Sequence, residues 1–122
     1  MQMKVLVVDD SATMRMMVVS TLRKAGFSGL DIEQAEDGKI ALDSIIKSVP
    51  DIVLADWNMP NMTGIELLEA VRAEEINVTF GFITTESTAS VRKQAIESGA
   101  SFLISKPFTA ESFEKALGKF IN

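Results

Sequence analysis

Five polar side chains each end, or directly follow, a short apolar run, and their types suit phosphoryl-group chemistry. They are Asp9, Asp10, Asp56, Thr84 and Lys106. Carboxylate oxygens bind hard divalent cations, and an ammonium group pairs with phosphate oxygens. An aspartate can also act as a nucleophile that forms a covalent intermediate. If the fold brings these side chains together, they could bind a cation and accept a phosphoryl group on Asp56.

Five segments are predicted to form strands, and they comprise residues 4–8, 32–35, 52–55, 78–84 and 102–105. The continuous apolar runs at 4–8 and 52–55 predict strands buried on both faces. Helical patterns follow each segment, so strands and helices alternate five times. This order predicts a single-domain α/β protein with a doubly wound parallel sheet, right-handed crossovers and helices on both faces. Ligands bind outside the carboxyl ends of such strands, where we expect the five polar side chains to meet.

The helices begin at recognisable caps. Asp10 or Ser11 can cap the first helix, so Asp10 could be a cap, a cation ligand or both. Thr63 and Glu66 have the spacing of a capping box at the third helix. The apolar stripe expected for the second helix consists of Leu42, Ile45, Ile46 and Val49.

Three carboxylates at one sheet edge require a cation. Two unit charges about 4 Å apart repel by about 4 kcal/mol at an effective dielectric constant near 20. Because the cluster offers only oxygen ligands, it favours Mg²⁺. Phosphoryl transfer mainly needs positioning and neutralisation of the phosphoryl oxygens, which Mg²⁺, Lys106 and the Thr84 hydroxyl could provide together.

The composition excludes several classes of function. A formal charge of −5 argues against nucleic-acid binding through phosphate contacts. The chain has no histidine and no cysteine, so it offers neither a histidine base nor a thiolate metal site, and any phosphohistidine donor must be another molecule. No apolar run is long enough to span a bilayer, and we therefore expect a cytoplasmic protein without membrane insertion.

Several motifs resemble those of response-regulator receiver domains, specifically of the CheY type. They are VVDDS at 7–11, AEDG at 35–38, DWNMPNM at 56–62, TG at 63–64 and KPF at 106–108. The resemblance covers residues 1–122 and implies one receiver domain without an output domain. It also implies the flavodoxin-like strand order 2-1-3-4-5, which the apolar pattern alone does not define.

The resemblance implies a role for each acidic residue of the site. Asp56 would accept phosphate from the phosphohistidine of a histidine kinase. Asp10 and Asp56 would ligate Mg²⁺ through their side chains, Asn58 through its backbone carbonyl, and Asp9 through a water molecule.

The resemblance also covers the residues that respond to phosphate. Thr84 and Lys106 would contact the phosphoryl group, and the Lys106–Pro107 peptide bond would be cis. Asn58 and Glu86 match positions that tune the loss of phosphate. Thr84, Thr85 and Leu103 occupy the switch region. Receivers of this type usually carry tyrosine or phenylalanine at the position of Leu103.

The resulting hypothesis is a stand-alone, phosphorylatable response regulator of a two-component, chemotaxis-type pathway. It would catalyse its own phosphorylation and dephosphorylation rather than turn over a substrate as a conventional enzyme does. We expect a monomer whose partners are a histidine kinase and either a flagellar motor switch protein or a phosphatase. Alternatives are a phosphate sink, a relay receiver and a Mg²⁺-dependent small-molecule phosphatase. A nucleotide-binding module is disfavoured, because neither glycine-rich phosphate-binding motif is present.

Overall fold

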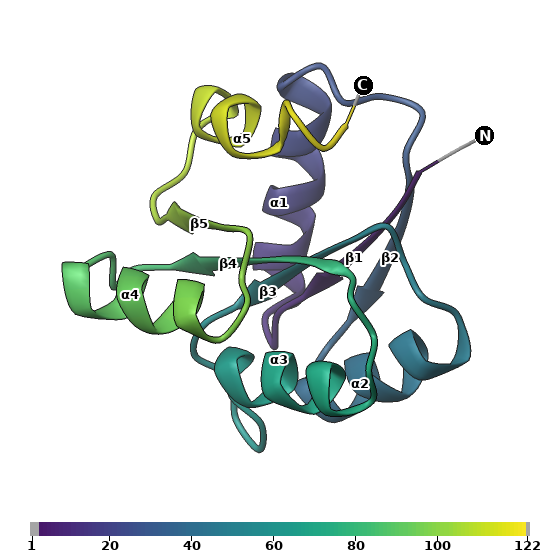
Figure 1. Cartoon of the computed structure of the whole chain (residues 1–122). Coiled ribbons are helices and arrows are strands. Elements are labelled where there is room, and N and C mark those ends of the chain that lie inside the picture. The colour runs from purple at the N-terminus through teal and green to yellow at the C-terminus, as the bar shows by residue number, and fades with distance from the viewer. Residues whose placement is uncertain (1–2, 122) are drawn as a thin grey trace.

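The computed structural model describes residues 3–121 and consists of a parallel sheet between two layers of helices (Figure 1). The strands are β1 (Lys4–Val8), β2 (Asp31–Ala35), β3 (Ile52–Asp56), β4 (Thr79–Thr84) and β5 (Phe102–Ser105). The helices are α1 (Ala12–Lys24), α2 (Gly38–Lys47), α3 (Gly64–Ala73), α4 (Ala89–Glu97) and α5 (Ala110–Leu117). The strand order is β2-β1-β3-β4-β5, which confirms the expected doubly wound, flavodoxin-like topology.

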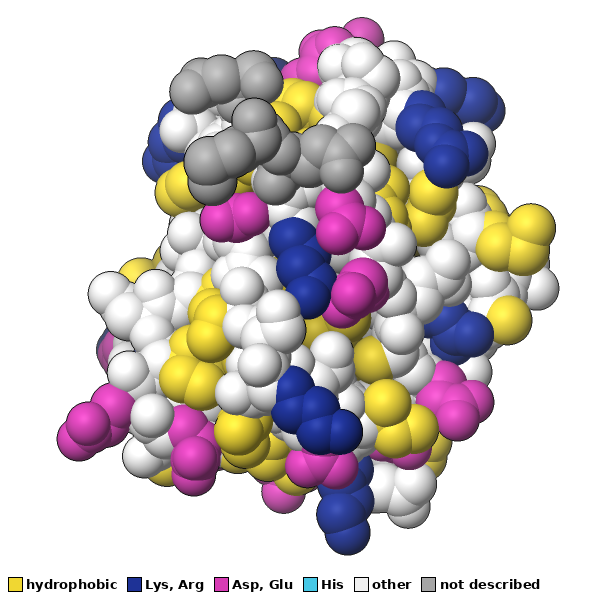
Figure 2. Space-filling view, turned by 90° about the vertical axis from the view of Figure 1, so that its right-hand side faces the viewer, with side chains coloured by type: hydrophobic (Ala, Val, Ile, Leu, Met, Phe, Trp, Pro, Cys, Tyr) yellow, Lys and Arg dark blue, Asp and Glu magenta, His cyan; other side chains and the backbone are white. Residues whose placement is uncertain are grey.

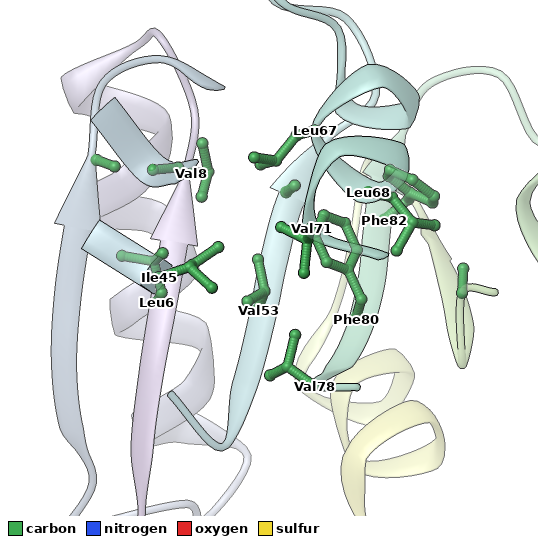
Figure 3. Packing of buried hydrophobic residues seen from close by; sticks show 14 of the residues in the cluster. Leu6, Val8, Ile45, Val53, Leu67, Leu68, Val71, Val78, Phe80 and Phe82 are labelled. Carbon is green, nitrogen blue, oxygen red and sulfur yellow. The ribbon is translucent and has the colours of Figure 1, made fainter. Parts of the chain in front are cut away.

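Alternating side chains of the strands build a separate core on each face of the sheet. Val5 and Val7 face α1 and α5, whereas Leu6 and Val8 face the layer formed by α2, α3 and α4. Figure 3 shows the second core, in which side chains from β1, β3 and β4 pack against helical leucine, isoleucine and valine residues. Because both faces are covered, β1, β3, β4 and β5 are mostly apolar, whereas the edge strand β2 (DIEQA) buries only Ala35.

The first and third helices begin at side-chain caps. The hydroxyl of Ser11 accepts a hydrogen bond from the backbone amide of Met14, so Ser11 is the cap of α1. The Asp10 carboxylate is therefore left for another role. Thr63 and Glu66 form the expected capping box at α3, each side chain accepting a hydrogen bond from the other residue's backbone amide.

The expected apolar stripe of the second helix was partly wrong. Ile45 is fully buried, but Ile46 and Val49 are 47% and 52% exposed. The helix ends at Lys47, so Val49 lies beyond it, and Ile46 is rotated about 100° from Ile45 around the helix axis. Ala41, one turn before Ile45, takes the core position instead.

Phe102 and Leu103 of β5 point to opposite faces of the sheet, as neighbouring residues of a strand must. Phe102 belongs to the core beside α5, and Leu103 packs against the core on the other face. The Phe102 ring lies over Gly81 of β4, where a methyl group would overlap it. Glycine at position 81 therefore makes room for this ring.

The start of β1 and the end of α5 lie at the side of the molecule away from the carboxyl ends of the strands (Figure 1). On the face that carries them, acidic and basic side chains are interspersed (Figure 2). Within residues 3–121, no helix combines the length and the hydrophobicity needed to cross a membrane.

Candidate functional site

Three carboxylates converge at the carboxyl ends of the two central strands. Val8 of β1 pairs with Ala55 of β3, so the residues that follow, Asp9 and Asp56, are neighbours across the sheet. Asp10 completes the cluster, and one carboxylate oxygen from each of the three residues lies within 4.8 Å of the others. The structure thus brings together the acids that the sequence placed at two separate strand ends.

Lys106 brings a positive charge into this cluster from the end of β5. Its Nζ lies 3.1 Å from Oδ1 of Asp56 and 3.8 Å from Oδ2 of Asp9. The lysine side chain is only 14% exposed. Its backbone is held by a 2.7 Å hydrogen bond from its amide to the carbonyl of Thr84, and the following peptide bond, to Pro107, is cis. Lys106 is therefore positioned to contact whatever group is attached to Asp56.

Asp9 is the most buried acid of the cluster, with 5% of its surface exposed. Burial raises the pKa of the Asp9 carboxyl above its usual value, and the neighbouring Asp56 and Asp10 carboxylates raise it further. The backbone amide of Ser11, which donates to Oδ1 at 2.9 Å, and the Lys106 ammonium act in the opposite direction. Burial is the largest of these effects, so the pKa of Asp9 is raised mainly because its carboxyl group is withdrawn from solvent.

Thr84 ends β4 and Thr85 directly follows it, beside the acids, whereas Leu103 lies within β5. Thr84 is buried, and its hydroxyl oxygen accepts a 2.9 Å hydrogen bond from the backbone amide of Glu86. The hydroxyl proton of Thr84 is thereby directed away from that amide and can be donated to another acceptor. The Asn58 amide donates to the Glu86 carboxylate at 3.4 Å, while Thr85 is exposed. Asn58 and Glu86 thus approach each other across the site entrance.

The loop after β3 folds back closely over the backbone of Asp56. The amide of Gly64 donates to the carbonyl of Trp57 at 3.1 Å, and a methyl group at Gly64 would overlap the Asp56 carbonyl oxygen. Trp57 packs edge-on against Phe82, with 4.8 Å between the ring centres. These contacts hold the chain on either side of Asp56.

Arg15 contacts the site, although the sequence interpretation did not include it. Its Nη1 donates to the backbone carbonyl of Asp9 at 2.6 Å, and its Nε donates to Oε1 of Gln34 at 3.0 Å. The only sequence signal was the position of Arg15 one turn after the cap Ser11, on the helix that follows the acids. Such a position does not reveal that the side chain turns back toward Asp9 rather than toward solvent.

The donor set fits a hard divalent cation with waters in its remaining positions. Three carboxylates offer only oxygen, they lie close enough to share one ion, and Asp10 and Asp56 are partly or fully open to solvent. Beside the acids, Lys106 offers a positive charge and the Thr84 hydroxyl offers a hydrogen-bond donor. Both could contact a second, anionic group. The arrangement can therefore bind a cation and a phosphoryl group side by side.

Comparison with known proteins agrees with this geometry. The family model described as response regulator receiver domain matches residues 5–118. The chain is 40% identical over 119 residues to the chemotaxis protein CheY-3 of Vibrio cholerae, covering 96% of this chain and 90% of that one. It is 38% identical over 119 residues to the chemotaxis protein CheY of Pseudomonas aeruginosa, covering 96% and 94%. The solved structure of the chemotaxis response regulator CheY4 of Vibrio cholerae superposes with a TM-score of 0.87 at 36% identity, covering 99% of this chain and 100% of that one.

Proposed function

The chain belongs to the response regulator receiver domain family, with CheY-type chemotaxis regulators among its relatives, and from this premise we propose that Asp56 is its phosphoryl acceptor. The observation that carries the proposal is the contact between Lys106 and Asp56 inside a cluster of three acids. Membership of this family implies that the phosphoryl donor is a phosphohistidine of a histidine kinase. Since this chain contains no histidine, that residue belongs to another molecule.

The acids would hold Mg²⁺. Asp10 and Asp56 would supply carboxylate ligands, Asn58 its backbone carbonyl, and Asp9 would act through a water molecule. When bound, the ion neutralises charge on the phosphoryl oxygens. The close approach of the three carboxylates supports this assignment, because their mutual repulsion is relieved by a divalent charge.

Phosphorylation is an in-line displacement at phosphorus. An Oδ atom of Asp56 forms the new P–O bond as the P–N bond to the donor imidazole breaks, and the imidazole retains the electron pair and takes a proton. Lys106 pairs with one phosphoryl oxygen, and the Thr84 hydroxyl donates to another. The 3.1 Å contact of Lys106 with Asp56 supports this assignment, because the ammonium group already lies beside the reacting carboxylate.

Loss of phosphate is hydrolysis of the acyl phosphate by water. The side chains that border the entrance control how that water approaches, and Asn58 and Glu86 are the two that face each other there. In this proposal the protein catalyses both steps on itself, and no separate substrate is turned over.

The phosphorylated form signals by binding another protein. A groove of about 460 Å³ lies between α4, β5 and α5, with Ile96, Leu103 and Lys115 among the residues that line it. Movement of the Thr84 hydroxyl toward the phosphoryl group would shift Thr85 and the start of α4, and thereby change this groove. At position 103 this groove is lined by an aliphatic leucine side chain rather than by an aromatic ring.

Phosphodonor labelling tests the acceptor assignment. Acetyl phosphate with Mg²⁺ should add one phosphoryl group to the intact protein, in a linkage labile to hydroxylamine. Asp56→Asn should abolish the addition, and so should removal of Mg²⁺ with EDTA. Stable labelling of Asp56→Asn, or steady turnover of sugar phosphates by the unmodified protein, would contradict the proposal, the latter in favour of a small-molecule phosphatase.

Capture of partners distinguishes the downstream roles. Protein treated with beryllofluoride, which mimics the phosphorylated state, is compared with an Asp56→Ala variant. A motor switch protein retained only by the treated form would support direct motor control. Retention of histidine kinases alone would indicate a phosphate sink, and transfer of phosphate onward to another histidine would indicate a relay.

A further inference from the structure

We infer that Arg15 is a positioning residue for the cation site, an inference that rests on the proposed Mg²⁺ binding described above. Arg15 donates to the carbonyl oxygen of the peptide that joins Asp9 to Asp10, at 2.6 Å. The orientation of this peptide sets the direction in which the Asp10 side chain leaves the backbone. The guanidinium group thus acts on the acids through the main chain rather than through their carboxylates.

The other contacts of this loop hold Asp9 but do not orient the Asp10 side chain. Asp9 is held by its amide, which donates to the carbonyl of Ala35 at 3.2 Å, and by its Oδ1, which accepts from the Ser11 amide. Among residues 3–121, the Asp10 carboxylate accepts no hydrogen bond. Asp10 therefore depends on the peptide plane that precedes it.

The guanidinium group joins the loop after β1 to β2. While Nη1 holds the Asp9 carbonyl, Nε donates to Gln34 on β2 at 3.0 Å. Arginine can make both bonds because its donors are arranged in a rigid planar fork, whereas lysine has a single nitrogen on a flexible stem. Arg15 therefore ties the loop that carries Asp9 and Asp10 to the neighbouring strand.

The main test measures Mg²⁺ affinity from the fluorescence of Trp57, which lies next to Asp56. Replacing groups that orient metal ligands typically weakens metal binding about 10–100-fold, and we expect a weakening in this range for Arg15→Gln. Arg15→Lys should lie between Arg15→Gln and the unmodified protein, because an ammonium group can still reach the Asp9 carbonyl. Arg23→Gln, which removes the same charge from an exposed position of the same helix, should bind as the unmodified protein does.

A second measurement separates positioning from general stability. The amide resonances of Asp10 and Ser11 should shift in Arg15→Gln, and their hydrogen exchange should accelerate, while the buried strand amides of β3 and β4 remain protected. Uniform loss of protection would show a merely structural role and overturn the inference.

The outcomes also separate this inference from the proposed function. If the unmodified protein binds Mg²⁺ and Arg15→Gln binds it within twofold of Arg23→Gln, the positioning role is wrong and the proposed function stands. If the unmodified protein itself does not respond to Mg²⁺, the proposed cation site fails, and the inference fails with it.

Discussion

Replacing Asp9 with asparagine should stabilise the protein in the absence of divalent cations. Asp9 is buried beside two other acids, and asparagine removes its charge while keeping an oxygen that can accept the hydrogen bond from the Ser11 amide. The variant loses the 3.8 Å ion pair with Lys106, but Lys106 keeps its shorter contact with Asp56. The change therefore relieves repulsion while keeping the hydrogen bond from the Ser11 amide.

The size of the effect follows from the distances. At 4.8 Å, a pair of carboxylates repels by about 3.5 kcal/mol at an effective dielectric constant near 20. The Lys106 pair at 3.8 Å attracts Asp9 by about 4 kcal/mol on the same scale, which offsets one of its two repulsions. The remaining repulsion, between Asp9 and Asp10, is screened because Asp10 is exposed. Together with the relief of Asp9 desolvation, we expect Asp9→Asn to raise the unfolding free energy by about 1–2 kcal/mol.

The gain should depend on pH in a defined direction. The folded state raises the pKa of Asp9 above its ordinary value of 3.8, so the folded protein binds this proton more tightly than the unfolded chain does. Asp9 therefore reduces stability as the pH rises from 3.8 through its folded pKa, and its cost is constant above that range. The advantage of Asp9→Asn should appear over the same range and vanish at lower pH.

Urea unfolding in EDTA, followed by far-ultraviolet circular dichroism, measures this difference. With an m-value of about 2 kcal/mol/M, the midpoint of Asp9→Asn at pH 7 should lie about 0.5–1 M higher than that of the unmodified protein. Added Mg²⁺ should stabilise the unmodified protein more than the variant, because a ligand stabilises the state that binds it. A variant less stable than the parent at pH 7, or a difference that persists unchanged below pH 3.8, would refute the electrostatic reasoning.

Three further predictions concern the fold and the site. Gly81→Ala should lower the unfolding free energy measured with urea by about 1–3 kcal/mol, because its methyl group overlaps the Phe102 ring. Adding Phe102→Leu should recover part of that loss, and additive effects of the two changes would contradict the clash. Arg72→Met removes three hydrogen bonds to backbone carbonyls and should cost about 2–3 kcal/mol, whereas an unchanged midpoint would show that water replaces them. Lys106→Met should slow labelling of Asp56 by acetyl phosphate about 100-fold, as judged by intact mass; a rate within twofold of the parent would exclude a role for the ammonium group in the transfer.

The sequence predicted the elements and the convergence of the acids because both follow from local patterns. Apolar runs define strands, and the carboxyl ends of parallel strands share an edge, so Asp9 and Asp56 were expected at the same edge of the sheet. The strand order came from the family resemblance, because five similar apolar runs do not specify which strands pair. The opposite facing of Phe102 and Leu103 followed from the two-residue period of a strand.

What the sequence could not predict depends on long-range packing. Ile46 and Val49 look like core residues, but whether an apolar residue is covered depends on where α2 ends and which helix lies beside it. Whether Asp10 or Ser11 caps α1 depends on the angle at which the chain leaves β1. The contact of Arg15 with the Asp9 carbonyl depends on the path of one long side chain, which no periodicity encodes.

The start of β1 and the end of α5 lie on the side opposite the acids, and this has a practical consequence (Figure 1). A fusion partner, a biotin tag or a surface tether attached at either end would extend away from Asp56 and leave the entrance between Asn58 and Glu86 open. Immobilised protein should therefore exchange cations and phosphodonors as freely as protein in solution. A circular permutant with new ends in one of the loops on that side should likewise retain the site.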